Sequence, residues 1–207
     1  GLPDRLVHEG RWSKTTDFCF WEKSILELNG KTLGVVGWGK IGRSVATVAA
    51  ALGMRILVAS RSQRHEPSDP DLRFVPLADL LTQADVLTLH CALTNGTRGL
   101  INAEALRTMK RSALLLNTAR GGLIVEKDLA AALNSNQIAG AALDVLTTEP
   151  PDDSSPLLSA SNCILTPHYA WASASSRKRL IHQLAANISA FLSNRPVNVV
   201  GTPPSHL

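Results

Sequence analysis

The sequence predicts an α/β fold, a doubly wound parallel sheet with helices on both faces. Two observations support this prediction. Short apolar runs alternate with segments of helical periodicity through the middle of the chain. The runs are nearly continuous in Val, Ile, Leu and Ala, as expected for parallel strands that are buried on both faces.

The expected strands and helices follow one another in regular order. Buried strands are predicted at Thr32–Gly37, Arg55–Ala59, Asp85–His90, Ala113–Asn117, Ala139–Leu143 and Cys163–Leu165. Helices are predicted at Arg43–Leu52, Leu77–Gln83, Ala103–Met109, Lys127–Leu133 and Ser173–Leu192. The last helix is expected to end near Arg195-Pro196, because proline cannot continue a helix.

Length, composition and charge exclude several classes of protein. The chain has 207 residues, 44% of them hydrophobic and 18% charged, which is a globular rather than a disordered balance. No apolar run is long enough for a membrane span, so we expect no membrane partner. The net charge of +4 is modest, and the densest basic runs are only Arg61–Arg64 and Arg177–Arg179. Nucleic-acid binding usually needs a basic stripe, so we expect no nucleic-acid partner either.

The cysteines indicate a reducing compartment. There are three, Cys19, Cys91 and Cys163, an odd number of residues far apart in the sequence and without metal-ligand spacing. They fit reduced thiols better than a disulfide framework. We therefore expect a cytoplasmic protein without a metal site.

A glycine-rich run follows the first predicted strand and opens the first predicted helix. It reads GWGKIG and has the G-x-G-x-x-G spacing of a Rossmann-type dinucleotide-binding loop. Gly37 permits a tight turn, Gly39 lets backbone N–H groups approach a pyrophosphate, and Gly42 lets helix and strand pack closely. The alternative is a glycine turn without a ligand. The predicted pyrophosphate contacts are Gly37, Gly39, Lys40, Ile41 and Gly42.

The end of the second strand indicates which dinucleotide is preferred. An NAD-selective site has Asp or Glu there, to accept a hydrogen bond from the ribose 2′-hydroxyl. Here the strand continues as ASRSQR, with no acid before Glu66. Ser60 and Arg61 can bind a 2′-phosphate instead, and Arg64 adds charge. We therefore predict NADP as the preferred cofactor over NAD; the alternative is an exposed basic loop without a cofactor role.

Three polar residues follow the carboxyl ends of predicted strands. Arg120 lies in NTARGG, Glu149 in TTEPP, and His168 directly after Thr166-Pro167. The carboxyl ends of parallel strands line the ligand crevice of an open sheet, so all three are expected at one site.

The chemistry of these residues suits the reduction of a 2-oxo acid. Arg120 can hold a carboxylate bidentately and polarise the carbonyl group. His168 can protonate the developing alkoxide, and Glu149 beside it would orient the imidazole and favour its protonated form. The cofactor would carry the hydride. Taken singly, the alternatives are a surface arginine, a solvated turn glutamate and a core histidine.

Several motifs together resemble one protein family, the D-isomer-specific 2-hydroxyacid dehydrogenases. They are GWGKIG, LHCALTNGTRGLIN, NTARGGLI, GAALDVLTTEP and TPHYAWAS, in a match that runs from about Arg11 to Val199. Within the family, the sequence resembles glycerate dehydrogenases and hydroxypyruvate reductases. The resemblance implies that Arg120 is a substrate-binding and catalytic residue, that His168 is the catalytic acid/base and that Glu149 is its catalytic partner.

The resemblance also implies further cofactor contacts. They lie in the Cys91-Ala92-Leu93 turn and at Thr97, Thr118, Ala119 and Asp144, with Asp144 near the nicotinamide carboxamide. The family often has Asp where Ser60 stands, which again favours NADP. Trp171 is expected either to form a wall of the substrate pocket or to belong to the core.

A domain organisation follows from the same resemblance. Family members are considerably longer than 207 residues and have a flavodoxin-like substrate domain built from both chain ends. We expect residues 1–25 to be a flanking segment at the domain junction or dimer contact, 26–166 to be the dinucleotide-binding domain, and 167–207 to return to the substrate domain. On this expectation the chain holds remnants of the second domain, as a fragment or a truncated product of a protein that is a homodimer at full length.

The resulting functional expectation is an oxidoreductase. Its substrates would be a small 2-oxo acid and the corresponding D-2-hydroxy acid, with glyoxylate and hydroxypyruvate as the leading candidates. Two alternatives stay open: a dinucleotide-sensing interaction protein like the family's corepressor relatives, and an inactive fragment that only binds cofactor.

Overall fold

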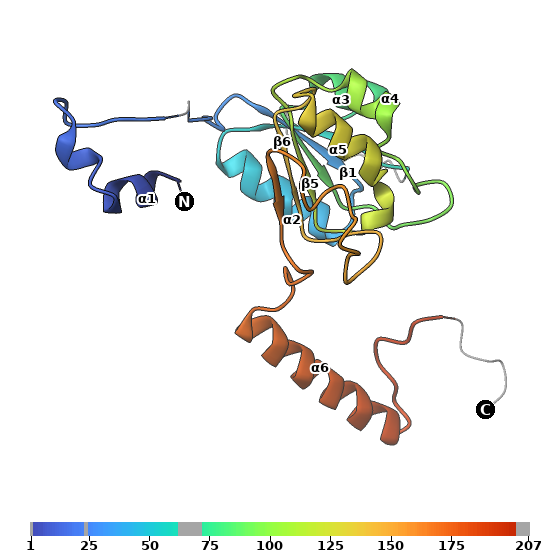
Figure 1. Ribbon diagram of the computed structural model, residues 1–207. Helices are drawn as coiled ribbons and strands as arrows, with labels where there is room; N and C mark the ends of the chain where they lie inside the picture. The colour runs from blue at the N-terminus through green and yellow to red at the C-terminus, as the bar shows by residue number, and fades with distance from the viewer. Residues whose placement is uncertain (1, 23–24, 62–71, 202–207) are drawn as a thin grey trace.

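The computed structural model describes residues 2–22, 25–61 and 72–201. Within them, seven parallel strands form one sheet in the order β3-β2-β1-β4-β5-β6-β7, flanked by helices (Figure 1). The strands are β1 (Thr32–Val36), β2 (Arg55–Ala59), β3 (Leu72–Phe74), β4 (Val86–Leu89), β5 (Leu114–Asn117), β6 (Gly140–Leu143) and β7 (Cys163–Leu165). The predicted parallel α/β fold is confirmed.

Helices cover the two faces of the sheet separately. They are α2 (Lys40–Ala51), α3 (Leu77–Gln83), α4 (Ala103–Thr108) and α5 (Glu126–Asn134). Successive strand residues point to opposite faces. Val35 accordingly packs in one apolar cluster with Ala46 of α2, whereas Val36 packs in the other with Leu80 of α3 and Leu129 of α5. The two clusters explain why the central strands are continuously apolar.

The strand order reverses at β1. Strands β2 and β3 lie on one side of it, and β4 to β7 lie on the other. In the parallel register Val36 is aligned with both Ala59 and Leu89, so these three strands end at the same edge. This edge, at the point where the order reverses, is where open α/β sheets bind ligands.

The observed elements differ from the sequence prediction in a few places. Helix α2 begins at Lys40 rather than Arg43, because Gly39 acts as its N-cap in an extended conformation. The edge strand β3 was not predicted, and neither were α1 (Leu2–His8) and the 3₁₀ helices η1 (Trp12–Lys14) and η2 (Gly121–Leu123).

Two segments lie apart from the sheet (Figure 1): the N-terminal segment with α1, and helix α6 (Ala174–Leu192). Ser173 is the N-cap of α6, where its hydroxyl accepts a hydrogen bond from the Ser176 amide. Every residue of α6 is at least partly exposed. Large apolar side chains are exposed on both segments, among them Trp12, Phe18, Trp21, Leu180, Ile181, Leu184 and Phe191.

Candidate active site

The glycine loop connects β1 to α2 by a turn that only glycine fits. Gly37 has a φ of +98°, and a Cβ there would lie 2.7 Å from the Cys91 nitrogen. A Cβ on Gly42 would lie 2.3 Å from the Gly37 carbonyl oxygen. At Gly39 the opposite holds, since a Cβ would meet nothing within 4 Å. The loop therefore has open space beside the start of α2, where the first helical amides have no partner within the helix.

A cleft of about 880 Å³ extends from this loop along the carboxyl ends of β1, β2 and β4. Seven of the predicted cofactor residues line it: Gly37, Gly39, Ser60, Arg61, Cys91, Ala92 and Thr97. The others lie elsewhere. Lys40, Ile41 and Gly42 form the first turn of α2, Thr118 and Ala119 follow β5, and Asp144 follows β6.

Several lining residues were not identified from the sequence. Val75, Pro76 and Leu77 follow the unpredicted strand β3 and form an apolar part of the cleft. His90, directly after β4, also lines the cleft. Its position could have been inferred from the sequence, because it is a polar residue at a strand end next to Cys91. Its Nε2 lies 3.0 Å from the Thr88 hydroxyl, and burial lowers the pKa of the imidazole.

The hydroxyl of Thr97 is used within the loop that borders the cleft. It donates to the Ala92 carbonyl at 2.7 Å and accepts from the Thr94 amide at 2.8 Å. Thr97 is buried, so these bonds fix the shape of the loop from Ala92 onwards. Cys91 at the start of this loop is half-buried, and burial raises the pKa of its thiol.

The end of β2 presents no acid to the cleft. Ser60 is half-buried and Arg61 is exposed, and both line the cleft. Among the lining residues that the structure describes there is no Asp or Glu. Arg64, the third residue of the predicted 2′-phosphate site, lies outside the described residues.

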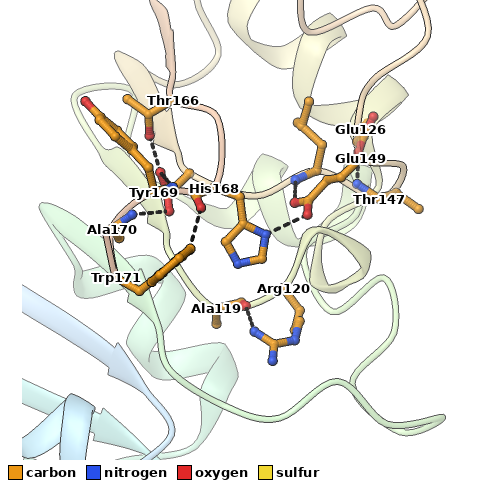
Figure 2. A network of polar contacts seen from close by, with 12 residues as sticks. Ala119, Arg120, Glu126, Thr147, Glu149, Thr166, His168, Tyr169, Ala170 and Trp171 are labelled. Atoms are coloured by element: carbon orange, nitrogen blue, oxygen red, sulfur yellow. Dashed lines mark hydrogen bonds and ion pairs between the residues drawn. The ribbon is translucent and has the colours of Figure 1, made fainter. Parts of the chain in front are cut away.

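Glu149 and His168 meet at the same edge of the sheet, beyond β6 and β7 (Figure 2). The Nδ1 atom of His168 lies 2.6 Å from Oε2 of Glu149, and the other carboxylate oxygen accepts the Leu146 amide at 2.9 Å. The hydrogen bond from His168, followed by that from Leu146, lowers the pKa of Glu149. An ionised Glu149 therefore accepts a hydrogen bond from Nδ1–H, and Nε2 is the ring nitrogen that has no partner among the described residues.

Asp144 lies under the turn that carries His168. It is 5% exposed, and its carboxylate accepts hydrogen bonds from the Thr166 hydroxyl and from the amides of Tyr169 and Ala170. Burial raises the pKa of Asp144, but these three bonds together with the nearby His168 outweigh burial, so that the pKa is lowered. The Asp144 carboxylate thus accepts hydrogen bonds from the 166–170 turn. Its predicted contact with a nicotinamide stays a prediction.

Arg120 lies at the end of β5, in a turn shaped by the buried Asn117. The Asn117 side chain donates to the Arg120 carbonyl at 2.9 Å and accepts from the Ala119 amide at 3.0 Å. The exposed guanidinium donates to the Ala119 carbonyl. In Figure 2 it lies on the side of the imidazole that faces away from Glu149. No hydrogen bond or ion pair joins Arg120 to His168 or Glu149 within the described residues.

The turn after β5 packs tightly against the segment that leads to Glu149. A Cβ on Gly121 would lie 1.9 Å from the Leu146 carbonyl carbon, so that only glycine fits there. The Glu126 carboxylate also accepts the Thr147 amide at 2.6 Å. Sequence reasoning missed Asn117, Glu126 and Gly121 as supports of the site, although Asn at a buried strand end was a visible signal.

A metal-binding cluster and a membrane-spanning helix are both absent from the described part of the chain. It contains no group of His, Cys, Asp and Glu suited to hold a metal ion. None of its helices has the length and apolar character needed to cross a membrane. Trp171 is 56% exposed and so lies outside the apolar core of the described residues; the alternative role as a wall of the substrate pocket stays a prediction.

Comparison with known proteins identifies related sequences. Residues 3–170 match the model of the D-isomer specific 2-hydroxyacid dehydrogenase NAD binding domain. The chain is 45% identical over 200 residues to a hydroxypyruvate reductase from Blautia hydrogenotrophica, covering 97% of the chain and 62% of the relative. It is 44% identical over 196 residues to a glycerate dehydrogenase from Methylorubrum extorquens, covering 94% of the chain and 60% of the relative.

Solved structures of related enzymes have a similar fold. An acyclic imino acid reductase in complex with NADPH and D-Arg superposes with a TM-score of 0.81 at 31% identity, over 97% of this chain and 62% of that one. A D-lactate dehydrogenase with NAD⁺ from Lactobacillus jensenii superposes with a TM-score of 0.80 at 28% identity, with the same coverage. The chain spans about 60% of the length of the relatives it matches.

Proposed function

Because the chain belongs to the D-isomer-specific 2-hydroxyacid dehydrogenase family, we propose that its protein interconverts a small 2-oxo acid and the D-2-hydroxy acid with a nicotinamide dinucleotide. The observation that carries the proposal is the Glu149–His168 pair at the same sheet edge as the glycine loop. Hydroxypyruvate and glyoxylate are the proposed substrates, since relatives named for their reduction match most of the chain.

The cleft fits a dinucleotide. Open space beside Gly39 at the N-terminus of α2 suits a pyrophosphate, because a helix N-terminus attracts anions. Ser60 and Arg61 would hold the adenosine ribose end, and the apolar residues Val75 to Leu77 would contact the adenine. When bound, the cofactor supplies the hydride for the carbonyl carbon.

His168 is proposed to supply the proton. With Nδ1–H held by Glu149, a protonated imidazole presents Nε2–H on its open side. This N–H donates its proton to the carbonyl oxygen as that oxygen becomes an alkoxide, and in the reverse direction the neutral Nε2 takes the hydroxyl proton.

Arg120 is proposed to bind the substrate. Its exposed guanidinium can donate two parallel hydrogen bonds to a carboxylate, and its charge polarises a neighbouring carbonyl group. The Asn117 bonds and the tight packing at Gly121 hold the turn that carries it.

NADP is proposed as the preferred cofactor. The end of β2 presents Ser60 and Arg61 to the cleft, and no described lining residue would repel a 2′-phosphate. Kd values for NADPH and NADH test this, and tighter binding of NADH would contradict it.

The organisation of the protein is also a proposal. We propose that residues 26–166 act as the dinucleotide-binding domain, between flanking segments 1–25 and 167–207. A cytoplasmic homodimer is proposed, because the cysteines in the structure are free and the N-terminal segment exposes Trp12, Phe18 and Trp21. Sedimentation of the full-length protein tests the dimer.

A panel of 2-oxo acids tests the activity. The full-length protein is mixed with NADPH or NADH and each acid, and the loss of absorbance of the reduced nicotinamide is followed. We expect turnover with glyoxylate or hydroxypyruvate. Binding of NADPH without turnover of any 2-oxo acid would contradict the proposed function.

A further inference from the structure

The backbone of His168 is held in an unusual conformation. Its φ is +50°, in the left-handed region that residues with a side chain rarely adopt. Such a conformation persists only where the surroundings fix it. In the proposed acid/base residue it determines where the imidazole points, because the side chain direction follows from the backbone.

Asp144 holds the amide end of the His168 backbone. The His168 amide donates to the Asp144 carbonyl at 2.9 Å, and the next two amides, of Tyr169 and Ala170, donate to the Asp144 carboxylate. Asp144 directly follows β6 and is buried, so the turn is attached to the rigid sheet.

Trp171 holds the carbonyl end of the His168 backbone. Its indole Nε1–H donates to the His168 carbonyl at 2.9 Å, as Figure 2 shows. The side chain is 56% exposed, so burial of apolar surface does not explain why a large aromatic residue turns toward this carbonyl. Both main-chain polar groups of His168 are thus bonded, the amide to the carbonyls of Asp144 and Thr166 and the carbonyl to Trp171.

We propose that Trp171 is a positioning residue, which holds the left-handed backbone of His168 through its indole N–H and thereby directs Nδ1 to Glu149. The role of Trp171 in catalysis rests on the proposed function. The hydrogen bond from Trp171 to His168, and its effect on the bond between His168 and Glu149, are independent of that function. A residue of this kind needs a hydrogen-bond donor at the end of a rigid side chain, which phenylalanine of similar shape lacks.

A matched pair of variants tests the proposal in the 207-residue chain. Trp171→Phe keeps an aromatic ring and removes the donor. Tyr169→Phe is the control: Tyr169 is equally exposed, at 57%, and its hydroxyl makes no hydrogen bond within the described residues. His168→Gln serves as the reference in which the imidazole bond to Glu149 is absent.

The readout is the pKa of Glu149, followed by carbon NMR of its carboxyl group. The largest cause that lowers this pKa is the hydrogen bond from His168, while Asp144 acts on it in the opposite sense. In Trp171→Phe we expect the pKa to rise by more than half of the rise seen in His168→Gln, and in Tyr169→Phe to stay at the wild-type value. A wild-type pKa in a folded Trp171→Phe would overturn the proposal.

A second measurement needs no variant. The Trp171 indole N–H should exchange with solvent more slowly than that of Trp21, which is 73% exposed and has no hydrogen-bond partner for its indole among the described residues. Equal exchange rates would overturn the proposal even if Trp171→Phe fails to fold.

Turnover in the full-length protein separates this proposal from the proposed function. Trp171→Phe should lower kcat by about 10- to 100-fold with the dinucleotide Kd unchanged, because the proton donor is displaced. If the wild type has no turnover but the pKa of Glu149 still responds to Trp171→Phe, the function fails and the positioning role stands. If wild type and Trp171→Phe have the same turnover and the pKa of Glu149 does not change, the positioning role is contradicted and the proposed function stands.

Discussion

The imidazole Nδ1 of His168 lies 2.6 Å from the carboxylate Oε2 of Glu149, although 19 residues separate them in the sequence. Each residue reaches this position from a different strand, Glu149 beyond β6 and His168 beyond β7. In this contact Nδ1–H donates to the Glu149 carboxylate, so Nε2 is the nitrogen available to a substrate. It is the geometric basis for proton transfer in the proposed reaction.

Glu149 should make stability depend on pH. Its pKa is lowered in the folded chain, so its contribution is present above the unfolded pKa and is lost as pH falls through the folded pKa. In urea unfolding, Glu149→Gln should be less stable than wild type at pH 7 and as stable as wild type once the carboxyl is protonated. The effect is expected to be small because the side chain is 36% exposed. A difference that persists unchanged in acid would contradict this prediction.

Ser60 and Arg61 should control the choice of dinucleotide. Ser60→Asp adds a carboxylate that repels a 2′-phosphate, and we expect it to weaken NADPH binding by about 10- to 100-fold while NADH binding holds or improves. Arg61→Ala should weaken NADPH binding alone. Ser161→Asp, which adds the same charge at an exposed site after β6 and outside the cleft, is the control. Equal losses for both dinucleotides in Ser60→Asp would exclude a 2′-phosphate site there.

Two glycines of the loop should respond differently to alanine. In Gly42→Ala the new Cβ would lie 2.3 Å from the Gly37 carbonyl oxygen, so we expect a loss of about 1–3 kcal/mol in the free energy of unfolding. In Gly39→Ala the Cβ meets no protein atom within 4 Å, so stability should hold while the methyl group occupies space needed by a pyrophosphate. Thermal unfolding and dinucleotide titration measure the two effects. Tight binding by a stable Gly39→Ala would place the pyrophosphate elsewhere.

The sheet could be predicted from the sequence because its strands are apolar on both faces. The runs at Thr32–Val36 and Leu114–Asn117 are of this kind. Strand β3 was not predicted because it is three residues long, lies at the sheet edge and is only partly buried. Its sequence therefore has no recognisable apolar pattern. The predicted start of α2 lies too late because Gly39 at the N-cap and Gly42 in the first turn lower the apparent helical propensity.

The candidate site was predictable only in part. Arg120, Glu149 and His168 stand out because polar residues follow strand ends, and family resemblance identifies them. The left-handed backbone of His168 and the bonds from the Tyr169 and Ala170 amides to Asp144 were not predictable, since main-chain amides leave no signature in the sequence. The Trp171 bond to the His168 carbonyl is of the same kind.

The most direct test of the central claim is the turnover of His168→Gln in the full-length protein, with the dinucleotide Kd measured on the same sample. His182→Gln, at an exposed position on α6, is the matched control. Loss of the proton donor should reduce kcat by about 10²- to 10⁴-fold and leave the dinucleotide Kd unchanged, while the control behaves as wild type. Wild-type turnover in His168→Gln would contradict the assignment of His168 as the acid/base.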